Sequence, residues 1–258
     1  MQEMSLSPWL VPLRRSARTE RRLICLPHAG GSAHTFRSLA AYLPEDIDMW
    51  SVQLPGRGSR FNEPPLQSMS EVLHELLPVV EMLLDYPSVL LGHSLGCRIG
   101  FELIRKLESE GRLVPSHFIA SGCRPVHLAD DATPMWPLSH DEFVARLTQY
   151  EGMPSELLND KDVMALIVPT LRADFRVAET HRNTINDTIS VPATVIVGNA
   201  DPSVPVTTLA SWKTHFLGDM DIAIVDGGHF FLQEQLENAL PALMSILAKV
   251  KRSSESVA

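Results

Sequence analysis

The 258-residue chain is poor in cysteine. Its three cysteines, Cys25, Cys97 and Cys123, are an odd number and lack the spacing of metal ligands. This pattern argues against a disulfide framework and against a zinc site, so we expect no bound metal. Cysteines that pack as small hydrophobic residues are typical of proteins in a reducing cytoplasm.

Membrane-directing segments are missing as well. No hydrophobic run approaches the length of a transmembrane helix, and the first twenty residues lack the apolar core of a signal peptide. We therefore expect a cytoplasmic protein that does not associate with membranes.

Positive charge is scarce. The formal net charge is -9, and no basic patch stands out that could neutralise phosphates, which argues against nucleic-acid binding. The one group of arginines lies between positions 14 and 22. We interpret it as a solvated part of a mobile N-terminal arm over residues 1–20.

The hydrophobic residues, 45% of the chain, suffice for one large core, and we expect a single domain over residues 1–258. Apolar runs typical of buried strands alternate with stretches in which apolar residues recur at helical spacing. This alternation predicts an α/β fold in which helices flank a mostly parallel sheet. The expected strands are 22–26, 48–54, 89–91, 117–120, 193–197 and 221–226, and the expected helices are 36–42, 69–84, 99–107, 206–216 and 232–250.

The strand pattern disappears between residues 124 and 190. This segment has helical spacing at 143–147, 162–168 and 171–178, and prolines at 134, 137, 154 and 169 punctuate it. A helical insertion between two core strands is a natural lid over a site at the strand ends. The alternative is a further packed layer without a gating role.

A Gly-x-Ser-x-Gly motif follows the expected strand 89–91. It reads Gly92-His93-Ser94-Leu95-Gly96 and runs into a helical pattern, which is the context of a nucleophile elbow. The glycines let strand and helix approach closely while Ser94 occupies a strained turn. The motif predicts Ser94 as a nucleophile and the backbone N–H of Leu95 as an oxyanion donor. The alternative is a glycine-flanked turn with an ordinary serine.

A Gly-Gly pair at positions 30 and 31 follows the strand 22–26. In hydrolases with a nucleophile elbow, this loop supplies the second oxyanion donor. Its position indicates the N–H of Ala29, and a plain strand-to-helix turn is the alternative. His28 beside it is interpreted as a structural hydrogen-bonding residue, since no second histidine or carboxylate stands at metal-ligand spacing.

The serine hydroxyl needs a general base, which in this arrangement follows an acid in the chain. His229 comes after a strand and a Gly-Gly turn, at the edge of the sheet where Ser94 is expected. His215 lies inside an expected helix. Position therefore favours His229 as the base.

Several aspartates are candidates for the acid that orients His229. Asp201 stands in the loop directly after the strand 193–197. Asp226, three residues before His229, is expected to cap the strand or face solvent, and Asp174 and Asp187 come from the less rigid insertion. We favour Asp201.

The loop Pro55–Arg60 contains two glycines and two arginines. It has neither the Gly-x-Gly-x-x-Gly spacing nor a phosphate-binding lysine, so no nucleotide cofactor is expected. We expect a flexible surface loop, with a loop that holds substrate as the alternative.

Five motifs in this order resemble the stand-alone type II thioesterases of nonribosomal peptide and polyketide biosynthesis. The resemblance runs from about residue 22 to residue 250, and the one mild departure is Leu95, where methionine is frequent. The motifs are Pro27-His28-Ala29-Gly30-Gly31, Gln53 to Arg60, Gly92 to Gly96, Leu171-Arg172-Ala173-Asp174-Phe175 and Gly227 to Phe231.

The resemblance implies the α/β-hydrolase fold and an editing activity. Such enzymes remove stalled or aberrant acyl groups from the phosphopantetheine thiol of acyl or peptidyl carrier proteins, which are then the expected partners. The substrate protein carries the phosphopantetheine, so the enzyme itself needs no cofactor. The resemblance also implies that the segment 171–175 belongs to the lid.

Other functions remain open at this point. An acyl-CoA or fatty-acyl thioesterase and a carboxylesterase would use the same catalytic residues, and a non-catalytic binding protein could share the fold. A metallohydrolase has no ligand motif behind it. Because carrier domains are commonly acidic, we expect docking through a basic or apolar patch near the lid, with Arg57 or Arg60 nearby.

Overall fold

A seven-stranded sheet forms the centre of the computed structural model, which describes residues 7–128, 133–148 and 160–251. The strand order is β1-β3-β2-β4-β5-β6-β7, and β1 is antiparallel to β3 whereas the other neighbours are parallel. The predicted α/β architecture is confirmed. The strands are β1 (Leu10–Arg14), β2 (Arg21–Leu26), β3 (Ile47–Val52), β4 (Ser88–His93), β5 (His117–Ser121), β6 (Ala193–Gly198) and β7 (Met220–Val225).

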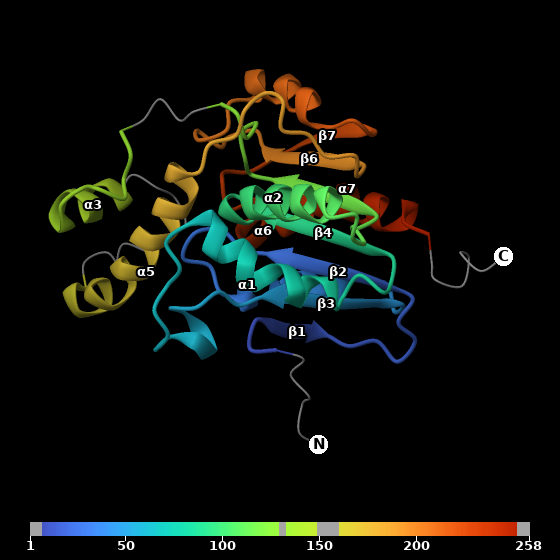
Figure 1. Cartoon of the computed structure of the whole chain (residues 1–258), viewed down its shortest axis with the longest axis horizontal. Coiled ribbons are helices and arrows are strands. Elements are labelled where there is room, and N and C mark those ends of the chain that lie inside the picture. Colours follow the sequence, from blue (N-terminus) through green and yellow to red (C-terminus); the bar gives the residue numbers. More distant parts are fainter. Residues whose placement is uncertain (1–6, 129–132, 149–159, 252–258) are drawn as a thin grey trace.

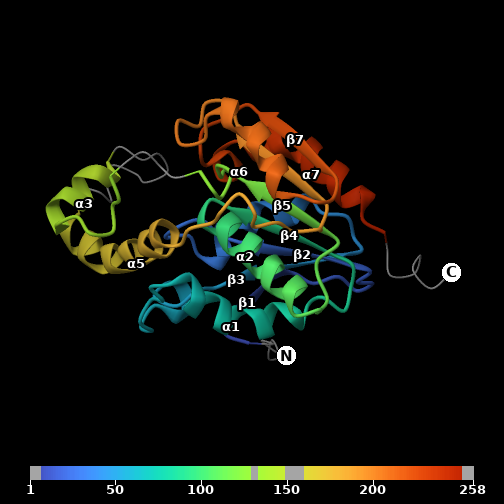
Figure 2. The ribbon, with the colours of Figure 1, turned by 45° about the horizontal axis from the view of Figure 1, so that its top comes forward.

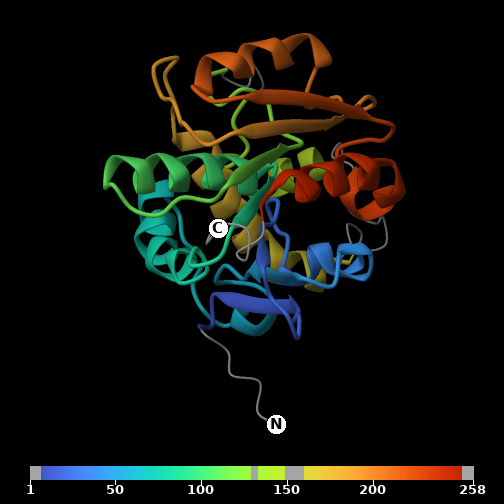
Figure 3. The ribbon, with the colours of Figure 1, turned by 90° about the vertical axis from the view of Figure 1, so that its right-hand side faces the viewer.

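Helices cover both faces of the sheet, as Figures 1 and 3 show. The central strands β3, β4 and β6 are buried along their whole length, as expected of parallel strands covered on both sides. One face packs against α1 (Met69–Glu81), α2 (Leu95–Ser109) and the 3₁₀ helix η3 (Val206–His215). The other packs against the 3₁₀ helix η1 (Ala33–Tyr42), α6 (Phe231–Glu234) and α7 (Leu236–Lys249).

Side-chain alternation along β3 divides the core between these two layers. Trp50 contributes to the cluster that contains Phe101 and Trp212, and its neighbour Met49 contributes to the cluster that contains Phe36. Successive side chains of a strand point to opposite faces, so each layer receives every second residue. The sheet is therefore held between two apolar cores.

The prediction of a mobile N-terminal arm is wrong for the described residues from 7 onward. β1 pairs with β3, and Leu10 lies opposite Val52. Trp9 and Leu10 are buried, so this edge strand gains both backbone hydrogen bonds and apolar contacts. Arg21 is buried too, and its Nε donates to Asp46 over 2.8 Å. Residues 1–6 lie outside the described residues.

The insertion between β5 and β6 is helical, as predicted. Its helices α3 (His140–Leu147) and α5 (Lys161–Thr180) lie together at one end of the sheet in Figures 1 and 2. They share an apolar cluster that includes Phe143, Met164 and Leu171. α5 continues through Pro169, where two shorter helical stretches were expected. Residues 129–132 and 149–159 of the insertion, with Pro154, lie outside the described residues, and a gating role stays a prediction.

Two expected helices differ in type. The stretches 36–42 and 206–216 form the 3₁₀ helices η1 and η3, and η1 is kinked at Phe36. Hydrophobic periodicity over one or two turns does not separate a 3₁₀ helix from an α-helix. Within the described ranges, no helix combines the length and the apolar character needed to cross a bilayer.

Candidate active site

Ser94 lies at a strained turn between β4 and α2. Its φ of 55° and ψ of -115° make it the one residue other than glycine with positive φ in the described part of the chain. A Cβ on Gly92 would lie 2.3 Å from the carbonyl oxygen of Gly96, and a Cβ on Gly96 would lie 2.0 Å from that of Leu26. Only glycine fits at either position, and the local geometry is that of a nucleophile elbow.

His229 is held by a carboxylate from the neighbouring strand end. The Nδ1–H of His229 donates to Oδ2 of Asp201 over 2.7 Å, and the Asp201 side chain is fully buried. Ser203 supports the same carboxylate, because its backbone N–H and its hydroxyl donate to Oδ1 over 2.8 and 2.6 Å. This arrangement places the proton of the His229 ring on Nδ1 and leaves Nε2 to accept another.

The environment of Asp201 favours its ionised form. Burial by itself raises the pKa of this carboxyl group, but hydrogen bonds from His229 and Ser203 outweigh burial and hold the pKa below its ordinary value. Asp201 is therefore a carboxylate near neutral pH. A negative charge there stabilises a positive charge on His229 when the ring takes up a second proton.

One cavity of about 640 Å³ brings the expected residues together. Ser94, Leu95, Ala29 and His229 all line it, and Asp201 stands behind His229. Its wall includes the loops that follow the strands of the sheet, the start of α2, and α3 and α5 from the insertion. The site therefore lies at the carboxyl ends of the parallel strands, between the sheet and the insertion.

In the glycine-rich loop after β2, the N–H groups of the two glycines are engaged, whereas no described residue engages that of Ala29. Gly30 N–H donates to Oδ2 of Asp174 over 2.7 Å, and Gly31 N–H donates to the His28 carbonyl over 2.9 Å. Among the described residues, neither Ala29 N–H nor Leu95 N–H has a protein acceptor. Both belong to residues that line the cavity, as an oxyanion hole requires.

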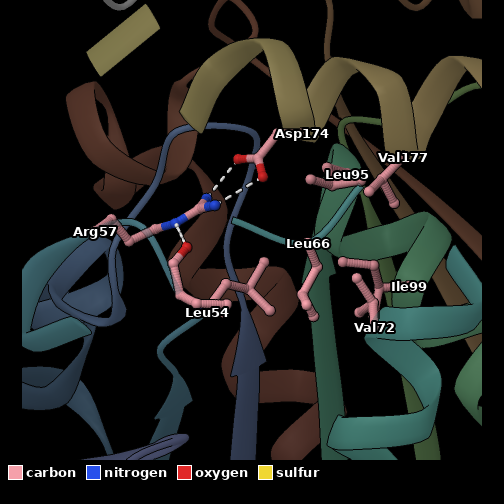
Figure 4. A pocket seen from close by; sticks show the side chains of 9 residues that line it. Leu54, Arg57, Leu66, Val72, Leu95, Ile99, Asp174 and Val177 are labelled. Atoms are coloured by element: carbon pink, nitrogen blue, oxygen red, sulfur yellow. Dashed lines mark hydrogen bonds and ion pairs between the residues drawn. The ribbon is translucent and has the colours of Figure 1, made fainter. Parts of the chain in front are cut away.

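Asp174 fastens this loop to the insertion. It lies on α5 and forms a two-pronged ion pair with Arg57, in which Nη2 lies 2.7 Å from Oδ1 and Nη1 binds Oδ2 (Figure 4). The Arg57 side chain is 7% exposed and the Asp174 side chain is 3% exposed. The hydroxyl of Thr170 donates to the Gly56 carbonyl over 2.8 Å and adds a second attachment. The loops after β2 and β3 are thus bound to one helix.

The expectation of a flexible surface loop at Pro55–Arg60 is wrong. Arg57 and Arg60 are both buried, and the Arg60 guanidinium binds Glu63 over 2.6 Å and lies 4.0 Å above the Trp9 ring. Both arginines are engaged in ion pairs, so neither guanidinium is free to form a basic docking patch. Docking through a basic or apolar patch near the lid stays a prediction. The sequence carries no signal for the partner of Arg57, because Asp174 is 117 positions away.

His93 was not singled out by its sequence, yet it packs directly against the site. It is fully buried, its Nδ1 lies 3.0 Å from the Ser121 hydroxyl, and its ring centroid is 5.2 Å from that of His229. Burial lowers the pKa of His93 well below its ordinary value, so the ring is neutral. Its only sequence signal is its place in the elbow motif, immediately before Ser94.

The rival candidates are engaged elsewhere. Asp226 accepts a hydrogen bond from the Asn199 side chain over 2.6 Å. His215 contacts the Asp187 carbonyl through Nδ1 over 2.6 Å and His127 through Nε2 over 2.5 Å. Of the aspartates considered, Asp201 is the one whose carboxylate contacts His229.

No group of three or more metal-ligating side chains occurs within residues 7–128, 133–148 and 160–251. His28, which lines the cavity, has its Nδ1 2.9 Å from the Ala29 carbonyl. That the enzyme needs no metal or cofactor of its own stays a prediction.

Comparison with known proteins identifies the family. The family model of the thioesterase domain matches residues 21–249. Linear gramicidin dehydrogenase LgrE of Brevibacillus parabrevis is 32% identical over 96% of each chain, and thioesterase PikA5 of Streptomyces venezuelae is 32% identical over 88% of this chain and 81% of its own. The type II thioesterase BorB from the borrelidin biosynthetic cluster has the same α/β-hydrolase fold, with a TM-score of 0.81 and 32% identity over 93% of this chain and 96% of its own. The chain therefore belongs to the thioesterase family, and it is a type II thioesterase, a hydrolase that acts on thioesters.

Proposed function

We propose that this enzyme hydrolyses acyl thioesters on the phosphopantetheine arm of acyl or peptidyl carrier proteins, and that it thereby frees carriers blocked by stalled or aberrant acyl groups. The observation that carries the proposal is the 2.7 Å hydrogen bond between Asp201 and His229 beside the cavity that contains the strained Ser94. The setting in which relatives act supports the substrate class, since BorB comes from a biosynthetic cluster.

The proposed mechanism begins with attack by the Ser94 hydroxyl on the thioester carbonyl. Nε2 of His229 accepts the hydroxyl proton, and Asp201 stabilises the doubly protonated ring. The N–H groups of Leu95 and Ala29 donate to the oxyanion of the tetrahedral intermediate. The C–S bond then breaks, and His229 returns its proton to the departing thiolate, which leaves an acyl-serine.

Hydrolysis of the acyl-serine repeats the sequence with water. His229 accepts a proton from water as the oxygen attacks the ester carbonyl, and it then protonates Ser94 as the carboxylic acid leaves. A thiol with a pKa near 8.5 is a better leaving group than an amine or an alcohol. The mechanism therefore suits thioesters particularly well.

The cavity fits a substrate with an apolar acyl group. Its volume of about 640 Å³ lies within the usual range of small-molecule sites. Leu171 and Phe175 from α5 and Phe230 from the loop after β7 line it, so it offers apolar surface close to Ser94. Such a lining favours an acyl chain over a highly polar substrate.

The test compares one acyl group on three carriers: a phosphopantetheine-loaded carrier protein, coenzyme A and p-nitrophenol. Mass spectrometry of the carrier and thiol or phenol release give kcat/KM for each. We expect the carrier protein to be the preferred substrate. A preference for coenzyme A or for the oxygen ester would instead favour an acyl-CoA thioesterase or a carboxylesterase.

Ser94→Ala is the matched inactive variant. We expect a loss of at least about a thousandfold in kcat, as for other hydrolases that lack their nucleophile, with an unchanged circular dichroism spectrum. Undiminished turnover by the folded variant would overturn the mechanism. Tight binding of acyl-carrier without turnover by the wild-type protein would point to a binding protein.

We also infer a cytoplasmic location. The three cysteines are free and buried, which is typical of proteins that fold in a reducing compartment. Cell fractionation with an antibody against the native protein tests this, and recovery outside the cytoplasmic fraction would contradict it.

A further inference from the structure

The lining of the catalytic cavity is positively charged, although the whole chain has a net charge of -9. In the described part of the chain, the cavity is lined by the guanidinium-bearing residues Arg57, Arg98, Arg124 and Arg182 and by one carboxylate, that of Glu179. Arg57 is paired with Asp174, so three arginines remain against that carboxylate. A cavity whose charge opposes that of the protein attracts anionic ligands.

Arg98 differs from the other arginines of this cavity. Arg57 is paired with Asp174, Arg124 donates to the Ser203 carbonyl over 2.5 Å, and Arg182 donates to the His181 carbonyl over 3.1 Å. The guanidinium group of Arg98 has no hydrogen bond and no ion pair with any residue that the structure describes, and the residue is half-buried. A partly desolvated guanidinium group without an acceptor is one that a ligand can satisfy.

The other cations of α2 show that this helix usually pairs its charges. Arg105 binds Glu102 and Asp187, and Lys106 binds Glu110. Arg98 also stands close to the positive end of the helix dipole, which disfavours a cation. Local stability therefore does not explain an arginine at this position.

The position of Arg98 is close to the nucleophile. Ser94 caps the start of α2, and Arg98 follows it by four residues. Arg98 therefore lies about 6 Å from Ser94 along the helix axis, on the same face of the helix. The pKa of the Cys123 thiol is lowered to about 7 by a hydrogen bond from Cys97 and, secondarily, by the charge of Arg98. Arg98 and Cys123, from the loop after β5, line the same cavity.

We propose that Arg98 determines specificity by binding a carboxylate at the far end of the acyl group, so that this thioesterase prefers acyl chains with an anionic end. The proposal rests on the proposed function, because it assumes that Ser94 attacks the thioester carbonyl. A carboxylate matches the two parallel N–H groups of a guanidinium. The phosphate of phosphopantetheine is also an anion, but it is separated from the thioester by the whole length of the pantetheine arm. Arg98 is one helical turn from Ser94, so its position suits a carboxylate on the acyl group rather than that phosphate.

The experiment uses two acyl groups of five carbons that differ only in the terminal carboxylate. Glutaryl and pentanoyl thioesters are prepared on N-acetylcysteamine, which has no phosphate, and on phosphopantetheine. The wild-type enzyme is compared with Arg98→Gln and Arg98→Lys. The matched control is Lys106→Gln, which removes one positive charge from an exposed site on the same helix.

We expect Arg98→Gln to lower kcat/KM for the glutaryl thioesters about 10- to 100-fold on both thiols, as for the loss of a hydrogen bond to a charged group. Pentanoyl turnover should change less than about threefold, because the apolar chain has no group for Arg98 to bind. For the glutaryl thioesters, kcat/KM of Arg98→Lys should fall between those of the wild type and Arg98→Gln. Lys106→Gln should match the wild type on all substrates. Most of the change should appear in KM.

Other outcomes would overturn the proposal. A loss restricted to the phosphopantetheine substrates, for both acyl groups, would assign Arg98 to the phosphate. An equal loss on all substrates would make Arg98 a structural residue, and no loss on any would show that it binds no substrate anion.

A binding measurement separates this proposal from the catalytic one. The non-hydrolysable amide analogue of glutaryl-N-acetylcysteamine is titrated calorimetrically into Ser94→Ala with and without Arg98→Gln. Weaker binding after Arg98→Gln supports the specificity role even if the wild-type enzyme hydrolyses neither thioester, a result that would refute the proposed function alone. Equal affinities would refute the role of Arg98.

Discussion

Replacing Asp174 with asparagine tests whether the buried ion pair joins the insertion to the catalytic loops. The substitution removes the negative charge but keeps the shape and an oxygen that can accept from Gly30 N–H, which now lies 2.7 Å from the carboxylate. Arg57, whose side chain is 7% exposed, is then left as a buried cation without its partner. Asparagine cannot neutralise it.

The expected cost follows from this burial. Removing one member of a buried ion pair typically destabilises a protein by about 3–5 kcal/mol. For a chain of this size, that corresponds to a fall in melting temperature of roughly 6–20 °C. A matched control is Glu81→Gln, which breaks the pair between Glu81 and Arg112. Both of those side chains are 37% exposed, and such a pair contributes about 1 kcal/mol or less.

The assay combines urea unfolding, followed by circular dichroism, with steady-state hydrolysis. The double variant Arg57→Met, Asp174→Leu removes both charges, so it should be more stable than Asp174→Asn. It also removes the acceptor of Gly30 N–H, so its kcat should stay low because the loop that contains Ala29 is no longer held. If Asp174→Asn costs less than about 1 kcal/mol, or if the double variant is as unstable as the sum of its single variants, the ion pair does not hold these parts together.

Three further predictions concern the site and the sheet. Asp201→Asn should lower kcat by about three to four orders of magnitude with little change in fold; a loss below about tenfold would mean that His229 does not depend on this carboxylate. Burial lowers the pKa of His117 from 6.5 to about 4, so the folded state favours the neutral ring. The contribution of this neutral ring to the stability of the protein is complete above about pH 6.5, and it is lost as the pH falls towards 4. An NMR titration of His117 with a midpoint near its ordinary value would contradict this. Gly122→Ala should destabilise the protein by about 1–3 kcal/mol and reduce turnover. The φ of Gly122 is +55°, and the new Cβ would lie 2.5 Å from the His93 ring. A variant with wild-type stability and rate would refute that reasoning.

The sequence by itself determined the features that depend on neighbouring residues. The elbow at Ser94 needs a strand, two glycines and a helix in immediate succession, so it is visible without the fold. Parallel strands end at the same edge of a sheet, so the loops that carry Asp201 and His229 lie at the same edge as Ser94. Position in the strand–helix alternation therefore singled out His229 among ten histidines and Asp201 among many carboxylates.

Features made by distant partners were decided only by the tertiary structure. β1 is a short edge strand whose stability comes from β3, and nothing within Leu10–Arg14 predicts that pairing. Arg57 looked like a surface residue because its partner Asp174 is 117 positions away. The helical pattern of α2 places Arg98 on the face of Ser94, yet its lack of an acceptor in the described structure emerges only once every neighbouring element is in place. Periodicity reports which face of an element is buried, whereas the pairing of charges depends on contacts between elements that sequence spacing does not encode.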